Sequence, residues 1–522
     1  MKLTTPLDNS NSKQKESALK RIFSSITVLT AFVLLALPAS EAAQAQVSAE
    51  TLRSISIPDK VDTSIGKLDF SDGVPTSNTV KILYDNLDRS RGLQVFLDNL
   101  GAVAIRAFLA GLAAQGADAP NKVAIFEQLM DSRAVVLTAN TSTLYAFSRT
   151  DLGKDGPTVI EVPPGMLGFL DDDWERFVGD IGVTGPDRGK GGKYLVLPAG
   201  YAGQVPSGYF LLKPRTNKNF LFLRGSIDKG LQAGAENMTS GIRIYPLKDA
   251  ANPASTTFIK LSGKPFNTLF PNTLAYYQLL NQIIQDEPLD AIDPSQRGAI
   301  ATIGIVKGKP FAPDDRMKKL LTEAATLGNA TARAITFDPR MDGVFLYPDT
   351  NSAWSAFFAN RNATFELDGT MQLDAAVLYY FNAGGVTPSM AKTAVGVGSD
   401  YAGAYFDSKK QPLNGSKTYK LHLPPNAPVN NFWAVTIYDT QTRSMLQTDQ
   451  RFPTVGSKTK GIEKNADGSF DIYFSPKAPA GKENNWLQTV PGKSWFAILR
   501  MYGPLEPWLN KTWRPSEIEP VP

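Results

Sequence analysis

Three consecutive carboxylates followed by an indole form the densest group of chemically competent side chains in the sequence, Asp171, Asp172, Asp173 and Trp174. Carboxylates beside an aromatic ring are typical of glycan and Ca²⁺ sites, and pairs of carboxylates carry out glycoside hydrolysis. The alternative is a solvated turn or a helix cap, which is the more common use of such a run. Asp172 and Asp173, together with Asp342 further along the chain, are the catalytic candidates.

Basic and aromatic side chains supply the candidates for holding a substrate, and these are Trp174, Arg340, Trp433, Tyr438, Trp486 and Arg500. Arg500 shares a predicted strand face with Phe496, Ile498 and Tyr502. Its guanidinium must therefore contact a carboxylate or carbonyl groups, or line a wet cleft, and an internal ion pair is the more common outcome. The indole and phenol rings of the set can stack on sugars, although such rings mostly pack inside β cores.

The chain of 522 residues contains no cysteine and one histidine, His422. The lack of cysteine excludes disulfides, thiolate metal sites, iron–sulfur clusters and cysteine nucleophiles. A single imidazole excludes sites that need two or three, and no serine and acid accompany His422 as a catalytic relay would require. No cofactor is expected. Ca²⁺ is the one ion left open, since residues 465–471 alternate oxygen ligands but lack the distal glutamate of a calcium loop.

The distribution of charge bears on the partners of the protein. The net charge is +4, and residues 1–45 contribute about half of it through five basic and three acidic side chains. The rest of the chain is nearly neutral, which argues against binding to nucleic acid. The expected partner is a small polar molecule or a glycan. A homo-oligomer is expected only because homo-oligomers are common among soluble proteins.

The N-terminus has the pattern of a secretory signal peptide. Basic residues at Lys20 and Arg21 precede an apolar stretch over 22–37, and Ala43 and Ala45 form a small-x-small cleavage site. The apolar stretch is shorter than the roughly 20 residues that a membrane span needs. We therefore expect cleavage near Ala45 and a periplasmic or secreted protein with no stable membrane span, and an uncleaved anchor is the alternative.

Hydrophobic patterning divides the chain into five parts. Residues 1–45 are the signal peptide and residues 46–75 are a polar leader. Residues 76–250 begin with one amphipathic helix that ends near Gly116, and they continue with at least six short β-rich runs that predict a small antiparallel sheet or barrel. Residues 251–336 predict a helical connector, and residues 337–522 a β-sandwich. The predicted class is mainly β, α+β overall.

The last part contains the most distinctive stretch of the sequence, residues 430–439. It is apolar on both faces and rich in β-forming residues, as expected for a central strand that is covered on both sides. Residues 495–502 form a second such strand. The Asp467-Gly468 pair predicts a hairpin turn, because glycine supplies the positive φ that the turn requires.

These segments resemble a known bacterial family. Residues 412–415, 419–424, 429–439, 465–469, 485–487, 499–504 and 513–515 resemble the domain of unknown function numbered twelve-fourteen. Residues 140–145, 161–163 and 220–224 resemble its usual N-terminal companion, numbered twelve-fifty-four. The first of these motifs adds Asn140, Thr143 and Tyr145 to the binding candidates, while Ser142 replaces the family's aspartate. The resemblance implies an exported protein of two domains with a jelly-roll-like C-terminal sandwich and no settled activity.

Two functions remain open on the sequence alone. One is an exported hydrolase or lyase that acts on a glycan or related polar compound with carboxylates in an interdomain cleft. The other is a carbohydrate-binding or cell-envelope protein without turnover. Carboxylates that converge with Arg500 or Arg340 in one cleft would favour the enzyme, whereas Asp342, Asp349 and Asp171 to Asp173 in open solvent would count against it.

Overall fold

A computed structural model describes residues 47–521, so the predicted signal peptide lies outside the described residues. The described chain forms two compact units. The first comprises residues 47–63 and 67–76, and contains helix α1 (Ala49–Ile55) and a three-stranded sheet of β1 (Lys60–Thr63), β2 (Gly66–Ser71) and β3 (Val74–Pro75). The second, residues 77–522 with residues 64–66, holds every other element and the cavity described below.

The second unit begins with two helices where the sequence predicts one. Helices α2 (Ser77–Asp98) and α3 (Leu100–Ala114) meet at a bend of 65°. The bend falls at Asn99, whose side-chain amide donates to the Val95 carbonyl at 2.9 Å. An asparagine that bonds to the preceding turn competes with the regular helix, which explains the break. Taken singly, none of the described helices is long and apolar enough to cross a membrane, and only this bent pair reaches that length and composition when its members are combined.

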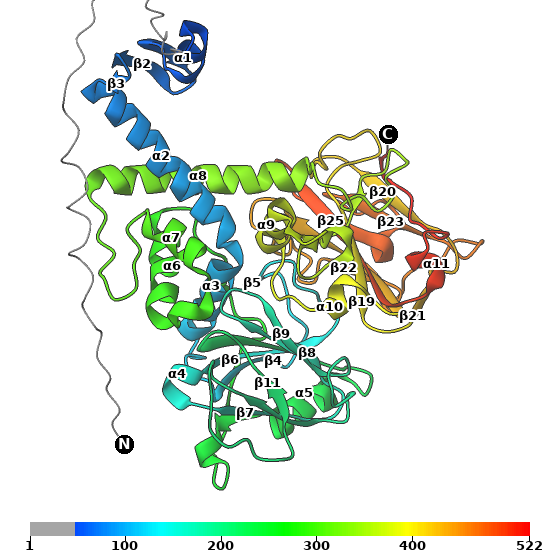
Figure 1. Ribbon diagram of the computed structural model, residues 1–522. Coiled ribbons are helices and arrows are strands. Elements are labelled where there is room, and N and C mark those ends of the chain that lie inside the picture. The colour runs from blue at the N-terminus through cyan, green and yellow to red at the C-terminus, as the bar shows by residue number, and fades with distance from the viewer. Residues whose placement is uncertain (1–46, 522) are drawn as a thin grey trace, which may run out of the picture. The chain divides into compact units, whose positions relative to one another are not determined.

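The predicted connector, residues 251–336, contains two short strands, β14 (Thr257–Lys260) and β15 (Phe266–Asn267), and is helical after them. Helix α6 (Leu274–Asp286), α7 (Pro294–Ala301) and α8 (Asp315–Phe337) follow one another, and α8 packs along α2 (Figure 1). Asp314 caps α8 by accepting from the Met317 amide at 2.7 Å, as expected for an aspartate before a helix. The remaining helices are α4 (Leu152–Asp155), α5 (Leu231–Gly241), α9 (Leu373–Asn382), α10 (Pro388–Ala391) and α11 (Glu506–Leu509).

The N-terminal β part consists of two packed sheets. The larger has the order β14 (Thr257–Lys260), β4 (Lys122–Phe126), β6 (Leu144–Asp151), β12 (Lys218–Gly225), β8 (Leu167–Asp172) and β9 (Phe177–Gly182). The smaller has the order β11 (Phe210–Leu212), β10 (Gly192–Val196), β7 (Thr158–Val162) and β13 (Arg243–Pro246). Apolar residues between the sheets form one core. The opposite face of the larger sheet carries a row of aromatic side chains from β6, β8 and β12.

The C-terminal part also consists of two packed sheets. The first has the order β16 (Trp354–Ser355), β19 (Ser399–Ala404), β25 (Trp495–Pro504), β21 (Val429–Asp439) and β22 (Thr454–Gly456), and the second β24 (Trp486–Gln488), β23 (Phe470–Ser475), β20 (Tyr419–Leu423) and β26 (Ile518–Pro520). Strand β21 is buried on both faces as predicted, although β25 is the middle strand. Jelly-roll connectivity remains a prediction. Two short pairs, β5 (Ala134–Val135) with β15 (Phe266–Asn267) and β17 (Glu366–Leu367) with β18 (Thr370–Met371), complete the strands.

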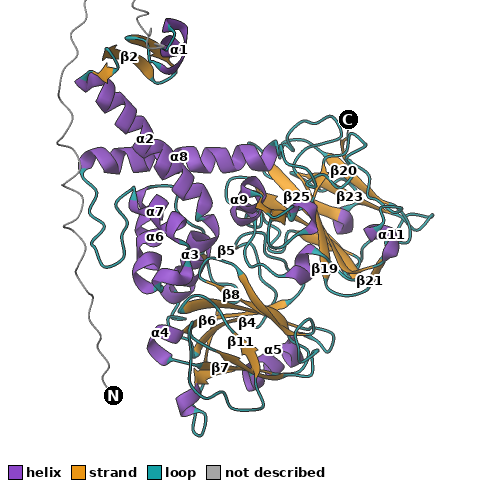
Figure 2. Ribbon diagram, in the orientation of Figure 1, coloured by secondary structure: helices purple, strands orange, loops and turns teal. Residues whose placement is uncertain are grey.

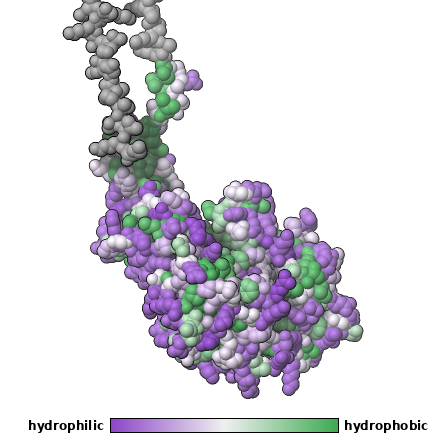
Figure 3. All heavy atoms as spheres, turned by 60° about the horizontal axis from the view of Figure 1, so that its bottom comes forward, coloured by the Kyte–Doolittle hydropathy of each residue, from purple (hydrophilic) through white to green (hydrophobic). Residues whose placement is uncertain are grey.

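Helix and strand are about equally represented, at about 28% and 27% of the described residues, which confirms the α+β class although strands do not dominate. Figure 2 shows helices lying between the two groups of strands. On the face of the molecule in Figure 3, hydrophobic residues occur as patches among hydrophilic ones. The buried apolar side chains form separate core clusters.

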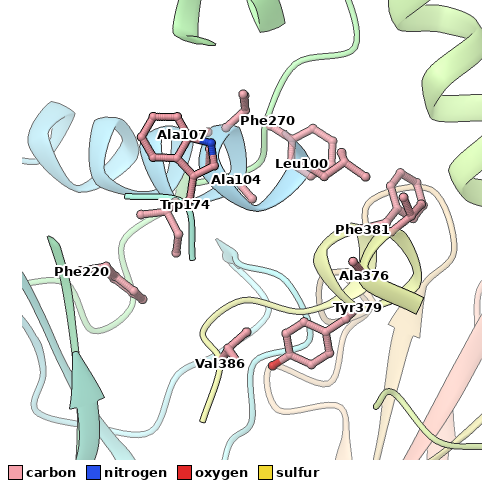
Figure 4. Packing of buried hydrophobic residues seen from close by; sticks show 14 of the residues in the cluster. Leu100, Ala104, Ala107, Trp174, Phe220, Phe270, Ala376, Tyr379, Phe381 and Val386 are labelled. Carbon is pink, nitrogen blue, oxygen red and sulfur yellow. The ribbon is translucent and has the colours of Figure 1, made fainter. Parts of the chain in front are cut away.

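A large core joins the two β parts. Ala104 from α3, Phe220 from β12, Tyr379 from α9 and Val386 after that helix lie around one space (Figure 4). On the C-terminal side the core includes residues on one face of β21 and β25, such as Tyr438, while the other face belongs to the sandwich interior. Each β part thus turns an outer sheet face toward this shared core.

Two glycines test how closely the helices pack. A Cβ on Gly328 of α8 would lie 2.3 Å from Cδ1 of Phe96, whereas a Cβ on Gly298 of α7 would meet nothing within 4 Å. Gly328→Ala is expected to destabilise the protein, because overpacking costs about 1–3 kcal/mol and outweighs the gain in helix propensity. Gly298→Ala, the matched control, is expected to stabilise it by about 0.5–1 kcal/mol. Urea denaturation measures both, and equal effects would contradict the packing.

Candidate functional site

The acidic run identified in the sequence is buried, and its members have structural partners. Asp172 accepts from the backbone amides of Trp174 at 2.9 Å and Arg176 at 3.1 Å, and pairs with the Arg176 guanidinium at 2.6 Å. Asp172 therefore stabilises the turn after β8. A turn was the structural alternative to a functional site for this run. The Trp174 indole donates to Asn99 at 3.3 Å and belongs to the shared core.

Asp173 belongs to an internal ion network. It pairs with Arg106 of α3, which also contacts Asp286 at 2.6 Å and Glu287 at 4.0 Å, and Lys218 contacts Asp286 at 2.6 Å. The network thus contains three carboxyl groups and two cations, so one carboxyl group is left without a full counter-charge. Burial, together with the neighbouring Asp173, raises the pKa of Glu287 to about 8. The buried pair Asp173 and Glu287 therefore retains a proton near neutral pH.

This proton predicts how stability depends on pH. A carboxyl group whose pKa is raised by folding stabilises the native state fully below its ordinary pKa, and this contribution is lost as the pH rises through the raised value. For Glu287 the window runs from about 4.5 to about 8. Glu287→Gln is expected to remove most of the fall in unfolding free energy across this window, measured by urea denaturation at several pH values. Glu236→Gln, at an exposed position on α5, is the control, and an unchanged pH slope in Glu287→Gln would contradict the assignment.

The other sequence candidates are scattered. Asp342 and Asp349 are exposed, and the Arg340 side chain is 85% exposed and only 3.7 Å from Asp374. Arg340 and Asp342 do line one open pocket, which has an empty volume of about 560 Å³, part of it solvent. Trp433 lies inside the C-terminal sandwich, and the half-buried Trp486 donates to the Ser475 carbonyl at 2.9 Å. The Trp433 ring is therefore not available as a sugar platform, whereas Trp486 remains a candidate.

The candidates for a metal site and for a catalytic relay through His422 lie in the described part of the chain. Residues 47–521 contain no group of three or more His, Asp or Glu side chains suited to hold a metal ion. Asp467 accepts from the amide and the hydroxyl of Ser469, as in a hairpin turn. His422 contacts Asp471 at 2.7 Å across strands β20 and β23.

A cavity occupies the space between the two β parts, and we call it the interdomain cavity. It encloses about 870 Å³ of empty space, including the part open to solvent. Six phenyl rings contribute to its wall, those of Phe108, Phe147, Phe220, Phe222, Phe357 and Phe358. Its polar lining includes Thr138, Tyr145, Tyr379, Tyr401, Arg224 and Arg500. Two of its lining residues are thus cationic, and no aspartate or glutamate lines it.

Arg500 reaches the interdomain cavity from the middle of β25. It is 4% exposed, and one terminal nitrogen donates to the Thr138 carbonyl and to the Tyr438 hydroxyl, the latter at 2.7 Å. Its Nε is buried without a hydrogen-bond partner. Among residues 47–521 no carboxylate pairs with Arg500, so the internal ion pair expected from the sequence is wrong.

Arg224 approaches the same cavity from β12. Its guanidinium lies 5.1 Å from the Phe222 ring centre and 5.8 Å from that of Tyr145, and its Nε is buried without a partner. Within the described residues it too has no carboxylate in salt-bridge range. An arginine keeps its charge in any protein environment, so two cations without a counter-charge line the cavity, the buried Arg500 and the half-buried Arg224.

A comparison with another buried arginine shows how such a guanidinium can be satisfied by carbonyl groups. Arg443 donates to the carbonyls of Phe381 and Gln441, and its guanidinium lies 4.1 Å from the Phe381 ring centre. Its Nε is thereby satisfied. The corresponding atoms of Arg224 and Arg500 are not, which is costly for a buried cation unless a ligand supplies the missing acceptors.

Backbone strain occurs at the same cavity. Thr138 has a φ of 40°, a left-handed conformation that β-branched residues rarely adopt. It is held there by three hydrogen bonds, from its amide to Arg443, from its hydroxyl to Asn382, and to its carbonyl from Arg500. Strain of this kind persists when the surroundings enforce it and occurs often at ligand sites.

Comparison with known proteins identifies two sequence families that match parts of the chain on either side of this cavity. Residues 120–246 match DUF1254 and residues 398–506 match DUF1214, each described as a protein of unknown function. The two matches confirm the predicted order of the two domains, DUF1254 before DUF1214. Arg224 therefore lies in the DUF1254 domain and Arg500 in the DUF1214 domain, so that each domain contributes one cation to the interdomain cavity.

Two solved structures are similar to this DUF1254–DUF1214 protein. The VPA0106 protein from Vibrio parahaemolyticus shares 20% sequence identity over 83% of this chain and 100% of that chain, with a TM-score of 0.49. A putative uncharacterized protein from Burkholderia cenocepacia shares 14% identity over 85% of this chain and 97% of that chain, with a TM-score of 0.39. No curated protein matches the sequence.

Three binding candidates come from the DUF1254 motif at residues 140–145. The Asn140 side chain accepts from the Ser142 and Thr143 amides at 2.8 and 3.1 Å, and so stabilises a turn. Tyr145 lines the interdomain cavity. Thr143 also bonds to Asn140, at 3.2 Å, and serves the turn. The structure thus brings Tyr145 and Arg500 together, with Tyr438 behind Arg500.

Sequence reasoning missed Arg224, Thr138 and Tyr401. A usable signal existed for Arg224, because it follows the apolar run Phe220–Leu223 just as Arg500 follows apolar residues in β25. The alternation of β12 places Arg224 on the face of Phe220 and Phe222.

Proposed function

We propose that this protein binds a small organic anion with an apolar body in the interdomain cavity. The observation that carries the proposal is a pair of arginines, one from each domain, whose Nε atoms are buried without a partner and which line an apolar cavity without any carboxylate. A buried guanidinium without a counter-charge is stabilised when a carboxylate or similar anion fills its free hydrogen-bonding positions.

The lining of the cavity indicates the chemical class of the part of the ligand that is not charged. Phenyl rings such as Phe147, Phe220 and Phe222 pack edge to face or stacked, with ring centres 5.2 to 6.1 Å apart. Such a wall suits an aromatic or branched aliphatic group, whereas a glycan would lose its hydration without finding polar partners. The amphipathic anion therefore fits this cavity better than the glycan considered from sequence.

Such a ligand is compatible with both an enzyme and a binding protein without turnover. A hydrolase that uses paired carboxylates is not supported here, because the acidic run belongs to the turn and the ion network. A lyase or other enzyme of proton transfer needs a base beside the bound anion, and a binding protein needs none. Export to the periplasm or the medium, expected from residues 1–45, is part of the same proposal, because such a protein would meet organic anions from outside the cell.

A ligand screen on the mature protein tests the proposal. Thermal unfolding is followed with benzoate and hexanoate, with benzamide as the neutral match to benzoate, and with glucose and galacturonate as neutral and acidic sugars. Benzoate and hexanoate are expected to raise Tm in proportion to the logarithm of their concentration, as ligands of the native state do. Benzamide and the two sugars are expected to have little effect. Stabilisation by either sugar, with none by the two carboxylates, would overturn the proposal.

A further inference from the structure

Tyr401 stands between the two arginines. In the antiparallel pairing of β19 with β25 it lies directly opposite Arg500, so the two side chains share a sheet face. The Arg500 guanidinium is 5.0 Å from the centre of the Tyr401 ring. The Tyr401 hydroxyl is buried and has no hydrogen-bond partner of ordinary geometry in the described chain. A buried hydroxyl without a partner at the wall of a cavity is poised to contact a ligand.

The electrostatic surroundings of Tyr401 lower the pKa of its hydroxyl. Burial alone would raise this pKa, but the charges of Arg224 and Arg500, together with the polar groups of Arg224 and Ser399 near the hydroxyl, bring it below its ordinary value. Its neighbour Tyr502 makes the contrast clear. It is also buried with an unpartnered hydroxyl, and there burial prevails and raises the pKa.

A second, smaller cavity lies on the other side of Tyr401. It has an empty volume of about 360 Å³, part of it solvent, and shares Arg224 and Tyr401 with the interdomain cavity. Its lining includes Asp180, Ser389 and Ser399. Asp180 accepts from the Thr387 and Ser389 hydroxyls at 2.6 and 2.8 Å, and burial raises its pKa. Tyr401 thus has an apolar chamber on one side and hydroxyl and carboxyl groups on the other.

We propose that Tyr401 is a proton acceptor that removes a hydrogen from the carbon next to the charged group of the bound anion. This inference rests on the proposed function and adds a reaction to it. It assigns to the protein the class of enzymes that exchange, shift or eliminate a proton beside a carboxylate. The arrangement on which it stands is a buried, unpartnered phenol oxygen flanked by two cations in a cavity with no other base.

The step balances without an oxidant or a second substrate. The C–H bond beside the carboxylate breaks, the proton passes to the phenolate oxygen of Tyr401, and the electron pair of the bond moves into the carboxylate as an enediolate. Arg224 and Arg500 stabilise the added negative charge, as preorganised cations do in proton abstraction. While it is protonated, the Tyr401 hydroxyl exchanges its hydrogen with water, and return of the exchanged hydrogen to the same carbon completes the cycle and leaves Tyr401 as the phenolate.

Hydrogen exchange in D₂O tests the step with mandelate, an arylacetate that carries one hydrogen beside its carboxylate. Proton NMR is expected to show loss of that signal with the wild-type protein, at a rate that rises with pH to a midpoint below the ordinary tyrosine value of 10.0. Tyr401→Phe is expected to lower the rate by about 10²-fold or more, the usual contribution of a proton-transfer group. It is expected to bind mandelate nearly as well as wild type, because the arginines and phenyl rings remain.

Tyr502→Phe is the matched control, and its exchange rate is expected to equal that of wild type. Retained mandelate binding with no exchange by the wild-type protein would overturn the role of Tyr401 and leave the proposed function standing. Exchange that survives in Tyr401→Phe would overturn it as well. No binding of mandelate at all would count against the proposed function itself, and so against both.

Discussion

Arg500→Met is expected to reduce benzoate affinity by at least about tenfold, because a hydrogen bond to a charged group contributes about 1.5–3 kcal/mol and each 1.4 kcal/mol corresponds to a factor of ten. Methionine keeps a flexible apolar stem in the same space but removes the charge. The Tyr438 hydroxyl still donates to the Ala139 carbonyl at 2.7 Å, so that the sheet face retains one of its polar contacts. Isothermal titration of wild type and variant measures the change.

The control for this variant is Arg340→Met, which removes an equal charge from an exposed position. Its benzoate affinity is expected to match that of wild type. Arg224→Met is expected to resemble Arg500→Met, since the two guanidiniums line one cavity from opposite domains. Equal losses in Arg340→Met and Arg500→Met would indicate a long-range effect of net charge rather than binding in the interdomain cavity.

Arg106→Met is expected to destabilise the protein by about 3–5 kcal/mol, because it leaves buried carboxyl groups without their cation. Asp173 and Glu287 are 0% and 1% exposed, and Arg106 is the cation that both contact. The loss is expected to shrink at low pH, where both carboxyl groups are protonated in the folded and unfolded states. Urea denaturation at neutral and acidic pH measures both effects.

Two further variants separate charge from packing at Arg106. The double variant Arg106→Met, Asp173→Asn is expected to recover part of the lost stability, since it removes one of the buried negative charges. Lys122→Met, which breaks the exposed pair with Asp118, is expected to cost no more than about 1 kcal/mol. A loss in Arg106→Met that is independent of pH and unchanged in the double variant would indicate that the aliphatic stem of Arg106, rather than its charge, stabilises the core.

Local patterns were sufficient for much of the fold. The two-faced apolar runs at β21 and β25 predicted buried strands, and Asp314 predicted the start of α8. The break between α2 and α3 was missed, because it depends on whether Asn99 bonds to the preceding turn or to solvent. Strands β8 and β9 were missed because their runs contain glycines and carboxylates, and their pairing with β12 rather than their composition makes them strands.

The candidate site was harder to predict from the sequence than the fold. The pattern around Arg500 correctly required a polar partner, a carbonyl or a wet cleft, but which of these it finds depends on residues more than 350 positions away in the chain. The acidic run at Asp171 to Asp173 drew attention because its residue types suit catalysis. The role of Asp172 in a turn is local, through Arg176, and was among the alternatives from the sequence. The ion network of Asp173 depends on the distant Arg106, which no local pattern encodes.

The location of a bound anion tests the central claim most directly. A crystal of the mature protein grown with 4-bromobenzoate, with data collected at the bromine absorption edge, reports the position of the ring without reference to any variant. The account predicts a bromine peak among the phenyl rings of the interdomain cavity, with the carboxylate within hydrogen-bond distance of Arg224 or Arg500. A fully formed crystal with an empty cavity, or with bromine only on the exterior, would contradict it.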